Sequence, residues 1–167
     1  MNFKKIHIFL IQPILNCMPF FWIDIFYDNY TYLANHGHFF FVLLWSLSTL
    51  YGLYTYALDI WKKYAIPYHK KKHTILCLGM FLVIFIPYQS SASFFNDLHV
   101  WLFILCFLFY LNEWKAMLSL KDGRLLFIGL LFCLSTFLII GSMTCFTESL
   151  CSLFMNSYFY YLSRKKL

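Results

Sequence analysis

The chain has 167 residues, of which 62% are hydrophobic and 12% are charged, and its formal net charge is +6 at neutral pH. Because charged residues make up about 25% of a typical soluble domain, this composition excludes an ordinary soluble domain and predicts a membrane protein. The charge does not indicate nucleic acid as a partner, because Lys and Arg lie in short clusters between apolar runs and do not spread over a soluble surface.

Six apolar segments follow one another along the chain. A membrane-spanning helix needs about 20 predominantly apolar residues, with a range of about 17 to 25. We therefore predict an all-α fold, a polytopic transmembrane helical bundle of six spans that forms a single integral membrane domain over residues 1–167. The spans are expected near residues 6–23, 39–61, 73–88, 98–114, 124–143 and 147–163.

The first segment has the start of a secretory signal peptide, with Lys4 and Lys5 before an apolar run. A cleaved signal would also need a small-x-small cleavage site, and none follows. Gln12, Pro13 and Asn16 interrupt the run, which is tolerated where neighbouring helices satisfy the freed polar groups. We therefore interpret this segment as the first span of the bundle.

The sixth segment is the most polar, because Glu148, Asn156 and several serines dilute it. An alternative to a sixth span is an amphipathic helix that lies in the membrane interface, with its tyrosines at the level of the lipid headgroups.

The basic residues indicate the orientation. All 13 Lys and Arg residues lie before the first segment, between the second and third, between the fourth and the first residue of the fifth, Arg124, or after the sixth. Cytoplasmic loops are enriched in Lys and Arg, so both termini are expected in the cytoplasm. Compact loops and the Lys-rich, Phe-rich composition favour a bacterial plasma membrane.

The opposite side collects carboxylates and histidines at the starts of the even-numbered spans. His36 and His38 precede the second span, Asn96, Asp97 and His99 open the fourth, and Glu148 opens the sixth. Asn96 and Asp97 have an ordinary explanation as helix caps. His99 and Glu148 lie just inside their helices, where ionisable groups are costly unless they are paired or line a wet cavity. Either the two form a hydrogen bond that holds the helices together, or the six residues form a polar pocket in the outer leaflet.

Zinc would be a further possibility at this pocket, although no resident cofactor is expected. His36, His38 and His99, with Asp97, supply the imidazole and carboxylate ligands that zinc accepts, and Glu148 would be the general base. The chain has no HExxH motif, and His36 and His38 would point in different directions on a helix.

The cysteines do not indicate a disulfide framework. Cys77, Cys106 and Cys133 lie inside apolar segments, where they act as soft apolar residues. A Cys145–Cys151 bridge is the alternative, and a separation of six residues on a helix is a poor geometry for it.

Several short motifs resemble the DRAM/Frag-type superfamily of small membrane proteins. They are the IPY sequence around Pro87, the LH pair at His99 and the sequence GSMTCFTESL, which contains Gly141 and Glu148 and leads into a Tyr-rich helix. The resemblance covers about residues 30 to 166. It implies a six-helix membrane protein without an agreed catalytic mechanism, and some eukaryotic relatives act around lipid or glycolipid remodelling. It marks His99 and Glu148 as family-like polar positions.

Three functions are consistent with this sequence. The first is a non-enzymatic membrane protein that binds or organises lipid, or serves a membrane protein partner, through the outer pocket. The second is a metal-assisted hydrolase or a lipid-modifying enzyme at the same place. The third is a small-molecule transport subunit. That third class resembles this chain only in size, and the first span lacks the Ala and Gly that such subunits use to dock a partner.

Overall fold

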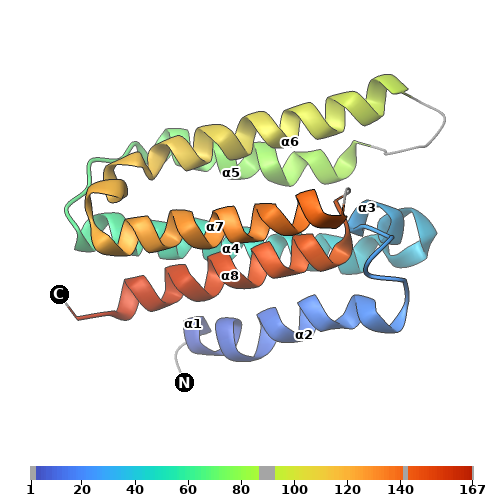
Figure 1. The fold of residues 1–167 in the computed structure, drawn as a ribbon, viewed down its shortest axis with the longest axis horizontal. Helices are drawn as coiled ribbons and strands as arrows, with labels where there is room; N and C mark the ends of the chain where they lie inside the picture. The colour runs from blue at the N-terminus through green and yellow to red at the C-terminus, as the bar shows by residue number, and fades with distance from the viewer. Residues whose placement is uncertain (1–2, 87–92, 141–142, 167) are drawn as a thin grey trace.

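The computed structural model describes residues 3–86, 93–140 and 143–166, with the side chains of residues 93, 95–97, 100, 134, 137 and 138 outside the description. Within these residues the fold is all-α and contains no strand, which confirms the all-α part of the prediction. The helices form six rods that run along the long axis of the molecule (Figure 1).

The first rod joins four short helices and the second joins three. The first contains α1 (Phe3–Ile6), the π-helical turn η1 (His7–Ile11), α2 (Gln12–Cys17) and the 3-10 turn η2 (Met18–Phe21). The second contains α3 (Tyr30–Leu33), the π-helical turn η3 (Ala34–His38) and α4 (Phe39–Lys63).

The other four rods are α5 (Lys70–Leu82) with η4 (Val83–Phe85), α6 (Ser93–Glu113), α7 (Lys121–Ile140) and α8 (Cys145–Arg164). A 3-10 turn, η5 (Lys115–Ser119), connects α6 to α7. In Figure 1, α5 and α6 form a pair on one side, α4, α7 and α8 lie in the middle, and the first rod lies on the other side. The first rod is held against α4 and α8, and α4 also packs against α5.

Local sequence explains the breaks between these helices. Thr144 caps α8, because its side chain accepts from Thr147 N while Thr144 N donates to the Thr147 hydroxyl at 3.0 Å. Asn29 caps α3 by accepting from Tyr32 N at 2.7 Å. Gly37 has a φ of +94° and kinks the second rod, a conformation that only glycine adopts without strain.

The aromatic core lies where α4, α6 and α8 meet, toward the Lys-rich end of the bundle. Trp61, Tyr110, Trp114 and Phe159 are fully buried there. The ring centroids of Trp114 and Phe159 are 4.3 Å apart, and those of Trp61 and Trp114 are 5.2 Å apart. Large rings therefore fill this part of the core.

One helix of the described residues, Tyr30–Lys63, is long and apolar enough to cross a membrane by length and composition, and Trp101–Glu113 is a shorter apolar helix. This finding is weak support for a membrane location, and the expected six spans go beyond it.

Candidate functional site

The histidines before the second span have local partners. His36 Nδ1 lies 2.8 Å from Tyr32 O, and the two rings stack with centroids 3.8 Å apart. The ring of His38 stacks on Trp22 with centroids 4.5 Å apart. Both histidines lie at the kink between α3 and α4; His36 contacts its own helix, and His38 contacts the end of the first rod.

The hydrogen bonds described for His99 and Glu148 lead to different backbone groups. His99 Nδ1 lies 3.2 Å from Ile86 O, at the end of the α5 rod. A Glu148 carboxylate oxygen accepts from Tyr30 N at 3.0 Å, so Glu148 satisfies one of the unpaired N–H groups at the start of α3. Asn96 and Asp97 lie in the first turns of α6, and their side chains fall outside the description.

In the described part of the chain, no group of three or more His, Cys, Asp or Glu residues has an arrangement that could hold a metal ion. The six cysteines, Cys145 and Cys151 among them, are all free thiols.

A chain of buried polar side chains runs through the interior between the first rod, α4 and α8. The first residue of this chain of side chains is His7. Its Nδ1 lies 2.7 Å from the Tyr56 hydroxyl, and its Nε2 lies 2.9 Å from Ser48 O. Gln12 Nε2 donates to the Ser48 hydroxyl at 2.9 Å. The Ser152 hydroxyl donates to Gln12 Oε1 at 3.3 Å. We name this chain the buried polar track; its members, of which Trp45 and Ser48 are half-buried, are His7, Gln12, Asn16, Tyr30, Trp45, Ser48, Tyr56, Ser149 and Ser152.

The track continues from Gln12 toward Glu148. Asn16 Nδ2 donates to Gln12 Oε1 at 2.9 Å, and Trp45 Nε1 donates to Asn16 Oδ1 at 2.9 Å. The Ser149 hydroxyl donates to Asn16 O at 3.4 Å and lies 2.9 Å from the Tyr30 hydroxyl. The track therefore connects three rods by hydrogen bonds between groups that would be costly to bury unpaired.

The π-helical turn makes this track possible. Gln12 N donates to His7 O, five residues earlier, so the turn holds one more residue than an α-helical turn. His7 and Gln12 are five residues apart and would diverge on a regular α-helix, whereas here both reach Ser48. The sequence analysis did not predict that the residues of the buried polar track form one hydrogen-bonded network. The feature that could have indicated the network is the presence of three polar residues, His7, Gln12 and Asn16, inside an apolar segment.

A second buried polar group joins α5 to α6. His73 Nδ1 lies 3.0 Å from a Glu113 carboxylate oxygen, and the imidazole is fully buried. Tyr54 stacks on the imidazole with centroids 5.1 Å apart, and Cys77 Sγ lies 3.9 Å from Nε2. His73 and Cys77 are both buried, so this group is closed to solvent. We therefore assign it a structural role, which is to hold α5 and α6 together.

The Lys-rich end of the bundle carries a cluster of ionic contacts outside the apolar segments. Asp122 accepts from Lys165 Nζ at 2.8 and 3.0 Å and from the Tyr64 hydroxyl at 2.9 Å. The hydrogen bond from Lys165 holds the pKa of Asp122 below its usual value. Burial, together with the bond to Asp122, raises the pKa of Tyr64 to about 12. Lys63 Nζ donates to Leu162 O at 2.6 Å.

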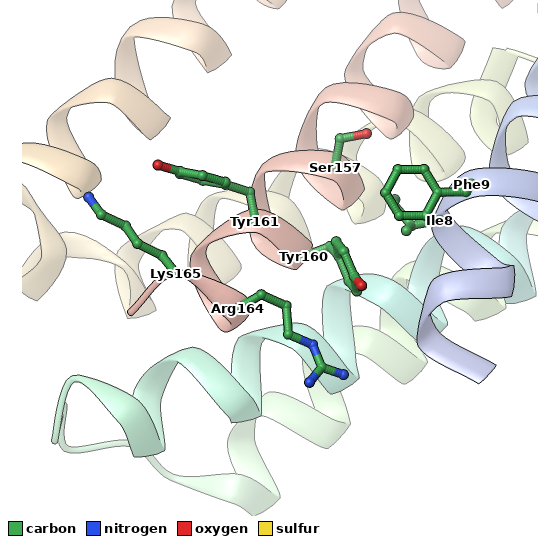
Figure 2. Close-up of a pocket in the computed structure, with 7 residues that line it drawn as sticks. All are labelled: Ile8, Phe9, Ser157, Tyr160, Tyr161, Arg164 and Lys165. Carbon is green, nitrogen blue, oxygen red and sulfur yellow. The ribbon is translucent and has the colours of Figure 1, made fainter. Parts of the chain in front are cut away.

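A groove with a volume of about 470 Å³ opens beside this cluster, between η1 and the end of α8 (Figure 2). In the close-up, Phe9 and Ile8 face the ring of Tyr160, whereas Tyr161 and Lys165 extend to the other side of α8. The floor is thus apolar and aromatic, and the end of the groove is cationic. We name it the α8 groove; it is lined by Ile8, Phe9, Ser157, Tyr160, Tyr161, Arg164 and Lys165.

Comparison with known proteins finds no protein-family model, no curated protein and no solved structure that matches this chain. The residues and their geometry are therefore the basis of the functional argument.

Proposed function

We propose that this chain is an integral membrane protein of six spans, with both termini in the cytoplasm, and that it binds membrane lipid in the α8 groove. Lipid binding is the function expected from the sequence. The α8 groove, however, lies at the opposite end of α8 from Glu148, which belongs to the outer pocket expected from the sequence.

The distribution of polar and apolar side chains supports the membrane location. The interior holds His7, Gln12, Asn16, His73 and Asn156, each at most 2% exposed. Large apolar side chains are exposed along the helices, which is costly in water and favourable in lipid. Prominent examples are Phe9 at 71%, Phe40 at 78%, Leu131 at 65%, Phe132 at 64% and Ile139 at 82%.

The position of the basic connections supports the orientation. Figure 1 has the α4–α5 turn, the α6–α7 turn and the C-terminus at one end of the bundle, and these segments carry most of the basic residues. Lys4 in the first rod pairs with Asp59 near the end of α4, so the start of the chain belongs to the same end. Cations on one face are typical of the cytoplasmic side of a membrane bundle.

The α8 groove is the observation that carries the lipid-binding proposal. It combines rings that would contact an acyl chain, Phe9 and Tyr160, with a cation at its end, Arg164. Aromatic side chains and Arg are typical of the boundary between the acyl chains and the headgroups of a membrane. A phospholipid would therefore place its acyl chain on the rings and its headgroup at Arg164.

Cysteine labelling tests the orientation. We would replace the six native cysteines, introduce Lys70→Cys or Tyr27→Cys, and treat intact cells with a membrane-impermeant maleimide. Tyr27 is 83% exposed and lies on the side that we propose to be outside. We expect position 27 to be labelled in intact cells and position 70 only after permeabilisation. Labelling of both positions in intact cells would contradict the orientation.

Native mass spectrometry tests lipid binding. Protein extracted in mild detergent should retain bound phospholipid, and Ser157→Phe should reduce the retained fraction several-fold, because a ring at position 157 fills the floor of the groove. Ile128→Phe is the matched control, since Ile128 is 61% exposed on α7 and does not line the groove. Equal retention in both variants would contradict the α8 groove as the site.

A further inference from the structure

We infer that the α8 groove selects an anionic phospholipid, whose phosphate is bound by Arg164 and whose acyl chain lies along Phe9 and Tyr160. This inference rests on the proposed lipid binding and adds the chemical class of the lipid.

Arg164 is the cation at the groove whose charge is not compensated within the described residues. The ion pairs of Lys and Arg with carboxylates in the described chain are Lys4 with Asp59 and Lys165 with Asp122, while Glu113 lies within hydrogen-bond distance of His73. The other cation of the groove, Lys165, is therefore already paired. The Arg164 guanidinium instead lies over the ring of Tyr160, with 5.8 Å between its carbon and the ring centroid.

The guanidinium is placed to bind a phosphate at the end of an apolar path. Figure 2 draws Arg164 extending beyond Tyr160, while Phe9 and Ile8 lie on the other side of that ring. The rings of Phe9 and Tyr160 meet edge to face at 5.9 Å, and Phe9 is 71% exposed. The planar fork of Arg binds two phosphate oxygens at once, and its contact with Tyr160 fixes its orientation.

Charge complementarity favours an anionic lipid over a zwitterionic one. A choline or ethanolamine headgroup brings a cation next to Arg164, and no carboxylate lines the groove to receive it. Asp122, which pairs with the lining residue Lys165, already accepts hydrogen bonds from Lys165 and Tyr64. Anionic lipids are attracted to basic segments at the cytoplasmic surface, which is the side that we propose for this end.

The test compares lipids of one acyl composition on the full chain. Purified protein in mild detergent is titrated with phosphatidylglycerol or phosphatidylcholine, and bound lipid is counted by native mass spectrometry. We expect phosphatidylglycerol to be retained about tenfold more strongly, and the preference to weaken at high salt because the headgroup contact is screened. Soluble glycerol phosphate should not displace the lipid, since it lacks the chain that contacts Phe9.

Substitutions at and near Arg164 test whether this residue causes the preference for phosphatidylglycerol. Arg164→Gln should reduce the tenfold preference to about onefold, and Arg164→Lys should retain part of it as a single point charge. Lys166→Gln, which removes a neighbouring cation outside the groove, should leave the preference nearly unchanged. Thermal unfolding of each variant would verify that it is folded.

The outcomes separate the two proposals. Retention of both lipids without preference in the wild-type protein overturns the selectivity and leaves lipid binding intact. A preference that survives Arg164→Gln overturns the assignment to this residue. Loss of all lipid from the wild-type protein overturns the selectivity and the proposed function together. Displacement by glycerol phosphate alone identifies a free phosphate ester as the ligand and also overturns the lipid assignment.

Discussion

Most polar side chains in the described interior have a defined hydrogen-bond partner, and this pairing lowers the free-energy cost of burying them. Gln12 is fully buried, and its amide both donates to Ser48 and accepts from Asn16. Three buried atoms of the described residues have no hydrogen-bond partner: the indole Nε1 of Trp61, the indole Nε1 of Trp114 and the Oδ1 of Asn156. That oxygen faces Gly52, where an added Cβ would lie 1.5 Å away.

Tyr56→Phe tests the track at one residue. The Tyr56 hydroxyl lies 2.7 Å from His7 Nδ1 and donates to Lys4 O at 3.2 Å. Its removal leaves a buried imidazole nitrogen without a partner, which we expect to cost about 1 to 3 kcal/mol of the free energy of unfolding. Denaturant unfolding in detergent measures this loss. Tyr51→Phe is the control, because the Tyr51 hydroxyl takes part in none of the described hydrogen bonds; an equal effect of both variants would contradict the assignment.

Asp122 predicts a pH dependence. Lys165 lowers the pKa of Asp122 in the folded protein, while the unfolded value is about 3.9. The stabilisation is therefore present above about pH 4 and is lost as the pH falls through the folded pKa. We expect the thermal midpoint of the wild-type protein to exceed that of Asp122→Asn at pH 6 and the two to converge at low pH. Asp24→Asn, in an exposed turn, serves as the control, and a gap that does not shrink would contradict this linkage.

At the scale of elements, polar contacts and close approaches hold the helices in register. The track fixes the first rod against α4 and α8, and the His73–Glu113 pair fixes α5 against α6. The start of α7 lies so close to η5 that only glycine fits at position 123. An added Cβ there would lie 1.8 Å from Met117 O, which already accepts from Leu120 N.

Gly123→Ala tests that close approach. A backbone carbonyl cannot rotate away, so we expect the variant to lose about 1 to 3 kcal/mol, as for other overpacked sites. Gly79→Ala is the matched control on α5, because its Cβ would meet only the Cys106 thiol at 2.7 Å. The thiol can move, and alanine improves helix propensity by about 1 kcal/mol. Differential scanning calorimetry of both variants measures the difference in thermal midpoint. Comparable midpoints would show that η5 moves to accommodate the added methyl group and would contradict the close approach.

Taken together, the described side chains differ from those of a soluble bundle on the outside, where many large apolar side chains are exposed, while the interior contains buried polar groups beside its aromatic core. The apolar exterior is the physical basis for proposing lipid as the surroundings, since one helix among the described residues passes the length and composition test. The basic connections gather at one end, and the α8 groove opens there.

Leu131→Arg tests the apolar exterior. Leu131 is 65% exposed near the middle of α7. If this face meets lipid, an Arg at the centre of the span should oppose insertion by about 2.5 to 3.5 kcal/mol. Leu120→Arg is the control, because Leu120 lies in the turn before α7, where Arg reaches the interface. Insertion is measured from glycosylation of engineered loop sites; equal insertion of the two variants would contradict a lipid-facing α7.

The six helical segments and the sorting of charge between their connections could be read from the sequence, because apolar runs and Lys clusters are properties of neighbouring residues. The second rod begins earlier than the expected 39–61, since Asn29 caps α3 and Gly37 then kinks the chain into α4. The proposed outer pocket and its candidate residues remain predictions, with the described bonds of His99 and Glu148 leading to separate backbone groups.

Composition and charge order along the chain therefore determined the helical class of this protein and the orientation that we propose. The tertiary structure alone decided which side chains meet: His7 with Tyr56, Gln12 with Ser48, and Phe9 with Tyr160. These contacts depend on a π-helical turn and on the register between rods. Register arises from the packing of side chains distant in sequence, which the periodicity of a single segment does not contain.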